Sequence, residues 1–375
     1  MKNLLMVADS EHNADMLYAV GMFVPDPFIY LRIRGRQIIV MSDLELDRAR
    51  REATQCSVIS LSQCQQKLRR AGRKKTGLPE VIRLLLRQYR VGKVFVPANF
   101  PLGLASDLRN LEVKVKVKPG VFFPEREQKT ADEVKKISAA LVMAEVGLSE
   151  GILAIKSAKV ARNRRLIYRG VPLTSEKLRS IIDTAIMQAN GLPANTIVAG
   201  GLQGCDPHER GHGPLRANEP IILDVFPRSQ KTGYFGDITR TVVKGRASES
   251  VRKVYDAVLR GQKTAFQMVR SGASTNDIHK TVLKFFAKEG YKTGRNDGHM
   301  QGFFHGTGHG LGLDIHENPR MGPNSTGTLI AGHVVTVEPG LYYPEIGGGV
   351  RLEDVALVTA NHARNLTQFE KVLEV

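Results

Sequence analysis

The chain has 375 residues, of which 42% are hydrophobic and 24% are charged. This length and composition exclude a disordered protein and indicate two globular domains. The formal net charge is +17, and part of the excess lies in RRAGRKKTG (69–77) and KVKVK (114–118). No nucleic-acid-binding motif accompanies these cations. We therefore interpret them as a solvated loop and the outer face of a strand, and we expect no nucleic-acid partner.

The chain has three cysteines and no CxxC pair, which argues against a disulfide framework or a structural zinc site. Its first residues lack the apolar stretch and the small-residue cleavage site of a signal peptide. No apolar run approaches the roughly 20 residues that span a bilayer. We therefore expect a reduced, cytoplasmic protein that has no membrane partner. The cysteines are Cys56, Cys64 and Cys205.

Residues 1–125 predict a small α/β domain. FIYLRI (28–33) and RQIIVMS (36–42) have the composition of two strands joined in a hairpin, and KVFVPANF (93–100) that of a further strand. LPEVIRLLLRQYR (78–90) has the apolar spacing of a helix and a proline near its start. This domain contains no cluster of His, Asp and Glu that resembles a site.

A domain boundary is expected at about residues 125–129, where Pro124 and a charged stretch lead into a long helical pattern. Thr130 and Glu133 have the spacing of a capping box, which marks the start of a helix. We therefore place the second domain at 128–375.

The second domain combines helical patterns with many strand-like segments. Two further helices are predicted around 175–190 and 249–270. This mixture indicates an α+β domain. The predicted strands are EPIILDVFP (219–227), GYFGDITRTVV (233–243), HVVTVEPGLYY (333–343) and GVRLEDVALVT (349–359).

Each of these four strands carries an acidic residue inside an apolar run. An isolated buried carboxylate is costly to desolvate, and its usual remedy is a partner charge or a metal ion. One such residue could lie at a strand edge or pair with an arginine. Four in one domain favour carboxylates that converge on divalent cations. The four residues are Asp224, Asp237, Glu338 and Glu353.

The segment FFHGTGHGLGLDIHEN (303–318) adds three histidines among four glycines. It lacks the spacing of a GxGxxG loop and a Walker lysine, so a nucleotide-binding loop is not expected. A helix that pairs His305 with His309 would contain several glycines, each costing roughly 1 kcal/mol relative to alanine. An extended or looping segment fits better, because its glycines let the backbone approach a crowded site where one histidine joins the carboxylates.

Five motifs, in this order, resemble the pita-bread metallopeptidases, which include Xaa-Pro aminopeptidases, prolidases and methionine aminopeptidases. The two-domain layout resembles the Xaa-Pro aminopeptidase/prolidase branch. The resemblance implies a pita-bread catalytic domain at 128–375 and a smaller creatinase-like α/β domain at 1–125. The motifs are IILD (221–224), GDITRT (236–241), GHGLGLDIHE (308–317), TVEPGLYY (336–343) and GGVRLEDVALV (348–358).

The resemblance also implies roles for individual residues. Asp224 corresponds to a ligand of one metal ion, and His309 and Glu338 correspond to ligands of another. Asp237 and Glu353 correspond to carboxylates that bridge the two ions. The residues that correspond to groups contacting the substrate or orienting the carboxylates are His305, His316 and Arg351.

One more family histidine precedes the first ligand aspartate, and two residues of this chain are candidates. His208 lies 16 residues before Asp224, and His212 lies 12 residues before it. We favour His208, because its distances from Asp224 and Gly201 are close to the family pattern. Asp224 and Asp237 are 13 residues apart, which is longer than usual in the family and implies a longer turn between their strands.

The implied activity is hydrolysis of an X-Pro peptide bond at a peptide N-terminus by a dinuclear metallo-aminopeptidase or dipeptidase. One histidine with four carboxylates favours Mn²⁺, with Co²⁺ or Zn²⁺ as alternatives. The resemblance also implies a homodimer and a peptide substrate with proline at its second position.

Three other functions are open to a chain with these features. The first is a methionine aminopeptidase, against which the long N-terminal domain argues. The second is a metal-free creatinase-type amidinohydrolase, which would not need all five ligands. The third is a catalytically weak or inactive pita-bread binding module with a basic surface.

Overall fold

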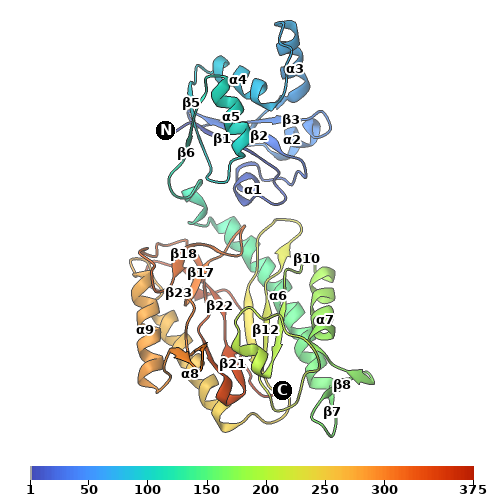
Figure 1. Ribbon diagram of the computed structural model, residues 1–375, viewed down its shortest axis with the longest axis vertical. Helices are drawn as coiled ribbons and strands as arrows, with labels where there is room; N and C mark the ends of the chain where they lie inside the picture. Colours follow the sequence, from blue (N-terminus) through green and yellow to red (C-terminus); the bar gives the residue numbers. More distant parts are fainter. Residues whose placement is uncertain (1) are drawn as a thin grey trace. The chain divides into compact units, whose positions relative to one another are not determined.

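The computed structural model describes residues 2–375 and divides the chain into two compact units (Figure 1). The first unit ends at Pro124, and the second runs from Glu125 to Val375. From the sequence, the boundary was expected at about residues 125–129. Each unit has its own hydrophobic cores, as is usual for separate domains.

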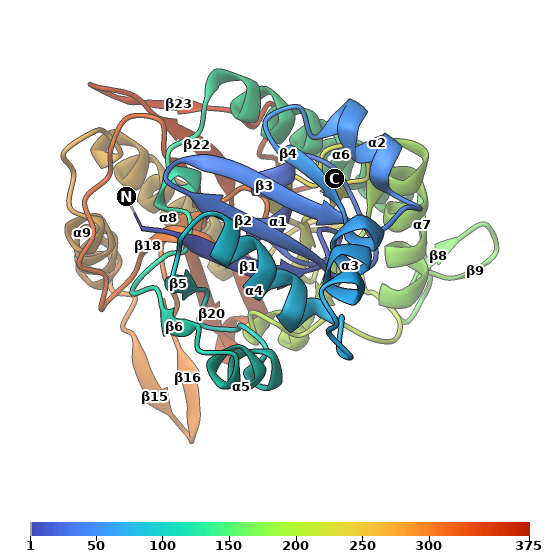
Figure 2. The ribbon, with the colours of Figure 1, turned by 90° about the horizontal axis from the view of Figure 1, so that it is seen from above.

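The first unit is built on a six-stranded sheet with the strand order β4-β3-β2-β1-β5-β6. The strands are β1 (Leu4–Ala8), β2 (Phe28–Ile33), β3 (Arg36–Met41), β4 (Ser57–Ser60), β5 (Lys93–Val96) and β6 (Lys114–Val117). The helices, seen with this sheet in Figure 2, are α1 (Ala14–Val20), α2 (Leu46–Glu52), α3 (Leu61–Arg70), α4 (Leu78–Gln88) and α5 (Leu102–Asn110).

Side chains on both faces of this sheet are apolar, because helices cover both faces. Leu5 and Leu31 share a core with residues of α3, α4 and α5, whereas Leu4 and Tyr30 share a core with residues of α1 and α2. This alternation follows from the two-residue period of a strand. The α/β prediction for the first unit is confirmed.

The predicted hairpin is also confirmed. Ile33 pairs with Arg36, and the two residues between them, Arg34 and Gly35, have φ values of 50° and 87°. Two consecutive positive φ values are typical of the tight turn whose twist matches that of the flanking strands.

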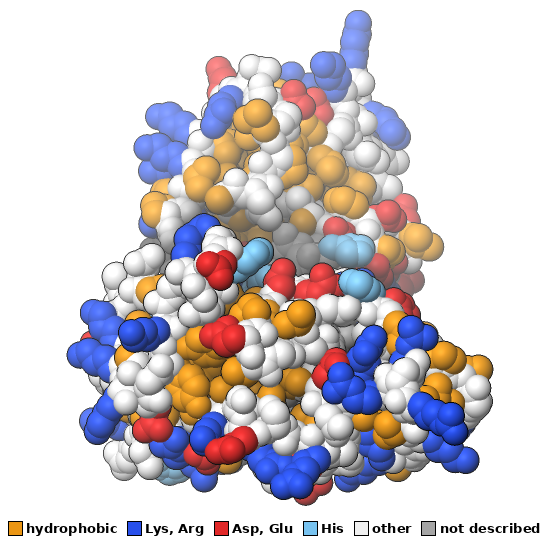
Figure 3. Space-filling view, turned by 60° about the horizontal axis from the view of Figure 1, so that its bottom comes forward, with side chains coloured by type: hydrophobic (Ala, Val, Ile, Leu, Met, Phe, Trp, Pro, Cys, Tyr) orange, Lys and Arg blue, Asp and Glu red, His pale blue; other side chains and the backbone are white. Residues whose placement is uncertain are grey.

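The two basic segments lie on the surface of the first unit. Residues Arg69 to Lys75 are exposed at and beyond the end of α3. In β6, Lys114 and Lys116 are exposed while Val115 is buried. Figure 3 shows Lys and Arg side chains in several separate groups on the face drawn, interspersed with acidic and neutral side chains.

The second unit packs two pairs of helices against antiparallel sheets. Figure 1 shows α6 and α7 on one flank of the strands and α8 and α9 on the other. One core joins α6 and α7 to a three-stranded sheet, and another joins α8 and α9 to a five-stranded sheet. The α+β prediction for this unit is confirmed. The helices are α6 (Ala131–Ser157), α7 (Ser175–Gln188), α8 (Glu249–Met268) and α9 (Thr275–Lys288).

The three-stranded sheet has the order β11-β12-β14, and the five-stranded sheet has the order β18-β17-β19-β22-β23. The first comprises β11 (Ile197–Gly200), β12 (Ile221–Val225) and β14 (Ile238–Val242). The second comprises β17 (Gly308–Gly310), β18 (Glu317–Met321), β19 (Val334–Val337), β22 (Asp354–Val358) and β23 (Ala363–Asn365).

Shorter strands form small ribbons around these sheets. They are β7 (Lys159–Val160), β8 (Leu166–Tyr168), β9 (Val171–Pro172), β10 (Gly191–Leu192), β13 (Arg228–Ser229), β15 (Gly294–Asn296), β16 (His299–Gln301), β20 (Gly340–Tyr343) and β21 (Gly348–Arg351). Short 3-10 helices are η1 (Pro124–Arg126), η2 (Gly201–Cys205) and η3 (Pro344–Ile346).

Helix α6 begins with the predicted capping box. The Thr130 hydroxyl accepts from the N–H of Glu133, and the Glu133 carboxylate accepts from the N–H of Thr130. By length and composition alone this helix could cross a membrane, although Glu145 and Glu150 interrupt its apolar sequence; 44% of its apolar window is buried, as in a core helix. It packs tightly on α7, because a Cβ on Gly147 or Gly151 would lie 2.7 or 2.8 Å from the side chain of Ile186 or Ile182.

Candidate active site

One cleft of the second unit, with a volume of about 630 Å³, is lined by all nine site residues named from the sequence. Asp224 lies on β12, His309 lies on β17, and Glu338 directly follows β19. Asp237 directly precedes β14, and Glu353 lies between β21 and β22. Separate strands therefore converge on this cleft. Its other named residues are His208, His305, His316 and Arg351.

Asp237, His309 and Glu353 lie close enough to share one metal ion. All three are buried, and one ligand atom of each lies within 4.8 Å of the others. His309 Nε2 is also 3.4 Å from Glu338 Oε1. His309 Nδ1 contacts the carbonyl oxygen of Gly310 at 3.1 Å, and because a carbonyl only accepts, Nδ1 carries the proton. The lone pair of Nε2 therefore faces the carboxylates, as in a histidine that ligates metal.

Burial makes the charged forms of these carboxylates costly. Burial, and next the neighbouring Glu353 and Asp224, raise the pKa of Asp237 well above its usual range. Burial and the nearby Glu338 likewise raise the pKa of Glu353. Burial raises the pKa of Glu338 to about 7 in spite of the opposing Arg351. Such a cluster of like charges is expected to hold either protons or a cation.

Glu353 also has an unused oxygen. Its Oε2 accepts a hydrogen bond of 2.8 Å from the hydroxyl of Thr239. Its Oε1 is buried, and within residues 2–375 no donor meets it. A buried carboxylate oxygen without a donor is destabilising unless another group coordinates it. The donor set and this oxygen therefore fit a divalent cation.

Arg351 starts a directed chain of hydrogen bonds. Its Nη2 donates to Asp224 Oδ2 at 2.8 Å, and its Nη1 donates to the Tyr342 hydroxyl at 3.0 Å. The Tyr342 hydroxyl is 2.8 Å from His305 Nε2, and His305 Nδ1 is 2.8 Å from the carbonyl oxygen of Gly306. Because that carbonyl requires the proton on Nδ1, Nε2 accepts from Tyr342. The two ring nitrogens of His305 are thus engaged by Gly306 and Tyr342.

The glycine-rich segment 303–318 is not helical, and as expected it combines extended and looping backbone. Gly308–Gly310 forms β17, which pairs with β18 and β19. A Cβ on Gly308 would lie 2.0 Å from the carbonyl oxygen of Thr336, and a Cβ on Gly310 would lie 2.1 Å from that of Asn318. Only glycine permits this close approach of strands around His309.

The structure separates the two candidate histidines of the 201–213 loop. His208 lines the cleft. His212 is exposed, and its backbone N–H and carbonyl are bonded to the side chain of Gln203 at 2.8 and 2.9 Å. On the opposite segment, the ring of His316 packs edge-to-face on that of His309, with 4.4 Å between centroids.

Several supporting residues were not identified from the sequence. Thr239 donates to Glu353, as described above, and the Thr336 hydroxyl accepts from the backbone N–H of His309 at 3.1 Å. Each threonine lies two residues from a predicted ligand and so shares its face of the strand. This two-residue spacing is the sequence feature that could have identified the two threonines. Tyr342 had no comparable signal, because its partners come from distant positions.

Comparison with known proteins places this site in a family. The model of metallopeptidase family M24 matches residues 135–360. The chain is 30% identical over 287 residues to the Xaa-Pro dipeptidase of Pyrococcus horikoshii, covering 74% of each chain. It is 32% identical over 194 residues to the Xaa-Pro dipeptidase of Pyrococcus furiosus, covering 50% of this chain and 52% of the relative.

Solved structures match over the whole chain. The X-Pro aminopeptidase from Thermotoga maritima has a TM-score of 0.83 at 20% identity, covering 100% of this chain and 98% of the other. The prolidase from Pyrococcus horikoshii has a TM-score of 0.80 at 24% identity, covering 100% and 95%. At these identities the likeness shows the fold, which confirms the pita-bread prediction. The family match and the curated relative together show that the chain belongs to metallopeptidase family M24 and is a metallopeptidase enzyme, as predicted.

Proposed function

We propose that this metallopeptidase hydrolyses the peptide bond between an N-terminal residue and proline. The observation that carries the proposal is the convergence of five ligand-type side chains in one cleft of the catalytic unit. The names of similar proteins support the substrate class, since they are called Xaa-Pro dipeptidase, X-Pro aminopeptidase and prolidase.

We further propose that two divalent metal ions bind in this cleft. Four carboxylates and one imidazole suit Mn²⁺, with Co²⁺ or Zn²⁺ as alternatives. Such ions would lower the pKa of a bound water and would polarise the scissile carbonyl. The residues that would hold them are Asp224, Asp237, His309, Glu338 and Glu353.

The surrounding residues would orient the ligands and the peptide. Arg351 holds Asp224 in place through a 2.8 Å hydrogen bond. His208 and His316 line the cleft, where an imidazole can hydrogen-bond the peptide or hold a proton during bond cleavage. Phe226 and Phe304 also line it and offer apolar surface to a proline ring.

We also propose that the protein acts in the cytoplasm as a homodimer. The cysteine usage supports a reducing compartment, and the family resemblance supports the dimer. Cell fractionation and light scattering of the purified protein test these two points separately.

One assay series tests the proposed function. The protein is stripped with a chelator, reloaded with Mn²⁺, and given Gly-Pro, Ala-Pro, an X-Pro-containing tripeptide and the matched dipeptide Ala-Leu. We expect binding of about two ions per chain, by the five-ligand argument, and cleavage of the X-Pro bonds only. Failure to bind Mn²⁺ at saturation would contradict the metal site. Equal cleavage of Ala-Leu would contradict the substrate class, and no cleavage of any peptide would favour the inactive binding module.

A further inference from the structure

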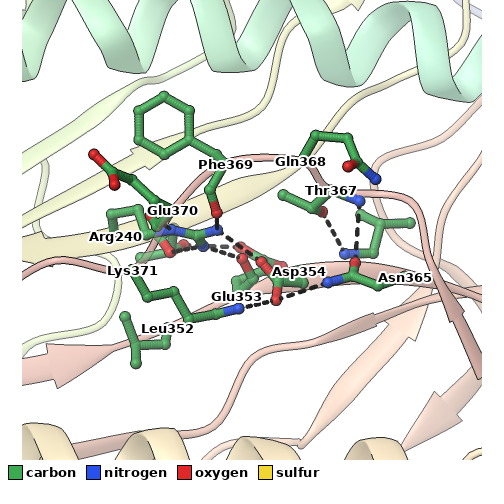
Figure 4. A network of polar contacts seen from close by, with 12 residues as sticks. Arg240, Leu352, Glu353, Asp354, Asn365, Thr367, Gln368, Phe369, Glu370 and Lys371 are labelled. Carbon is green, nitrogen blue, oxygen red and sulfur yellow. Dashed lines mark hydrogen bonds and ion pairs between the residues drawn. The ribbon is translucent and has the colours of Figure 1, made fainter.

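A buried ion pair lies behind the candidate metal site (Figure 4). Arg240 lies on β14, and Asp354 is the first residue of β22, directly after Glu353. Arg240 Nη2 and Asp354 Oδ1 are 2.8 Å apart, and the two side chains are only 2% and 1% exposed. A buried ion pair is tolerated only when its remaining donors and acceptors are also satisfied. The hydrogen-bond partners of Arg240 and Asp354 therefore indicate the structural role of this ion pair.

The other donors of Arg240 hold backbone carbonyls on two sides. Nη1 donates to the carbonyls of Thr239 and Glu353 at 2.9 and 2.6 Å. Nε donates to the carbonyl of Glu370 at 2.9 Å, and Nη2 donates to that of Phe369 at 2.7 Å. One guanidinium thus joins the strands of the candidate site to the C-terminal segment.

Glu353 is the residue whose position this arrangement sets. Its N–H donates to the carbonyl of Thr239 at 3.1 Å, and its own carbonyl accepts from Arg240. Its Oε2 accepts from the Thr239 hydroxyl. The oxygen left over is Oε1, which is buried and meets no donor within residues 2–375. The backbone contacts therefore aim one free carboxylate oxygen at the candidate metal site.

The C-terminal segment also holds Asp354 directly. Lys371 Nζ contacts Asp354 Oδ2, and Asn365 Nδ2 donates to the same oxygen at 3.3 Å. The Thr367 hydroxyl accepts from the N–H of Val355 at 2.9 Å, which ties the segment to β22. The side chain of Lys371 is 22% exposed, so it is less buried than the side chains of Arg240 and Asp354.

We propose that residues 366–371 form a C-terminal strap that positions Glu353 for metal binding, acting through Arg240 and Asp354. The inference rests on the proposed metal site and adds a part of the chain to it. Because coupling between two binding events is reciprocal, metal binding in turn stabilises the docked strap.

The test measures metal affinity and strap protection on the full-length protein. Arg240→Lys keeps the charge but loses most of the carbonyl contacts, and Lys371→Met removes one contact to Asp354. Lys284→Met, at an exposed position of α9, is the matched control. Calorimetric titration of chelator-treated protein with Mn²⁺ should show the dissociation constant raised about 10–100-fold by Arg240→Lys and about tenfold by Lys371→Met, as for other outer-shell partners. Lys284→Met should leave it unchanged.

Amide hydrogen exchange provides a second measurement. If the strap were only a structural part of the fold, its exchange rates would not respond to Mn²⁺. Addition of Mn²⁺ should slow exchange of the amides at 366–371 in the wild-type protein. The inference would be wrong if folded Arg240→Lys and Lys371→Met proteins bound Mn²⁺ with unaltered affinity. It would also be wrong if Mn²⁺ did not change the exchange rates of the strap amides. Either result would leave the proposed metal site uncontradicted. Absence of Mn²⁺ binding by the wild-type protein would instead overturn the proposed function. If Arg240→Lys does not fold, Lys371→Met decides the question.

Discussion

The two units of this protein bury different kinds of side chain. Within residues 2–124, the buried polar side chains are those of Ser10 and Ser60. The second unit buries charged groups of both signs, among them Asp237, Arg240 and Glu353. Both units have strands of similar length and apolar cores, so the contrast does not come from how their sheets are made.

The contrast indicates that the second unit, unlike the first, needs partners for its buried charges in addition to apolar packing. Burial of apolar side chains accounts for the cores of the first unit, since none of the charged residues within 2–124 is fully buried. An uncompensated buried charge is destabilising by several kcal/mol. The second unit offsets this cost with ion pairs such as Arg240–Asp354, except at the cluster around Glu353, where protons or a cation are the remaining partners. The following experiments test or refine this comparison.

The largest expected effect is loss of activity when one of the two carboxylates predicted to bridge the metal ions is removed. Asp237→Ala or Glu353→Ala should lower kcat by about 10³-fold or more, because each change removes a group that would hold both ions. Steady-state assays and elemental analysis measure this. Asp107→Ala, at an exposed carboxylate of the first unit, is the control and should change neither quantity. Near-normal turnover with full metal content in either cleft variant would show that the ligand assignment is wrong.

A smaller effect distinguishes the two loop histidines. His208→Ala should lower kcat about 10²-fold while metal content stays intact, as expected for a lost positioning or proton-transfer group. His212→Ala, which removes a side chain outside the cleft, should lower kcat by less than about tenfold. If His212→Ala is the impaired variant and both proteins fold, the loop has a different conformation in solution.

The pH dependence of stability should differ between the metal-free and the Mn²⁺-loaded protein. Burial raises the pKa of Glu338 to about 7, and burial likewise raises the pKa of Asp237 and Glu353. The folded metal-free protein therefore holds more protons than the unfolded chain, and its stability falls as pH rises from the ordinary carboxylate range to about 7.

Bound Mn²⁺ replaces those protons, so the gap in Tm between loaded and metal-free protein should widen by about 5 °C over this interval. Scanning calorimetry at several pH values measures the difference in Tm between the loaded and the metal-free protein. Groups outside the site titrate in both forms, so their contributions cancel in this difference. A gap that stays constant with pH would contradict the carboxylate cluster as the source of the effect.

The smallest expected effect concerns the basic surface of the first unit. Replacing Arg69, Arg70, Arg73, Lys74 and Lys75 by glutamine should change kcat/KM less than about twofold, because these cations are exposed and belong to the unit without the cleft. Tight binding of RNA or DNA that weakens steeply with added salt would show instead that this surface has a partner.

Much of the local structure could be predicted because it depends on neighbouring residues. The hairpin at 28–41 follows from alternating apolar residues around a turn that needs Gly35. The start of α6 follows from Thr130 and Glu133. The non-helical form of 303–318 follows from glycines that a helix would not tolerate. The resemblance to the family located nine of the residues that line the cleft.

The sequence by itself thus determined several of the helices and strands, the family and the residues that could supply metal ligands. Only the tertiary structure decided which groups complete them. Tyr342 lies between Arg351 and His305, accepting a hydrogen bond from the first and donating one to the second. Arg240 holds the carbonyls of residues more than a hundred positions away. No local sequence pattern predicts such partners, because they come into contact only when separate strands and the C-terminal strap pack together. The buried charges of these residues require partners.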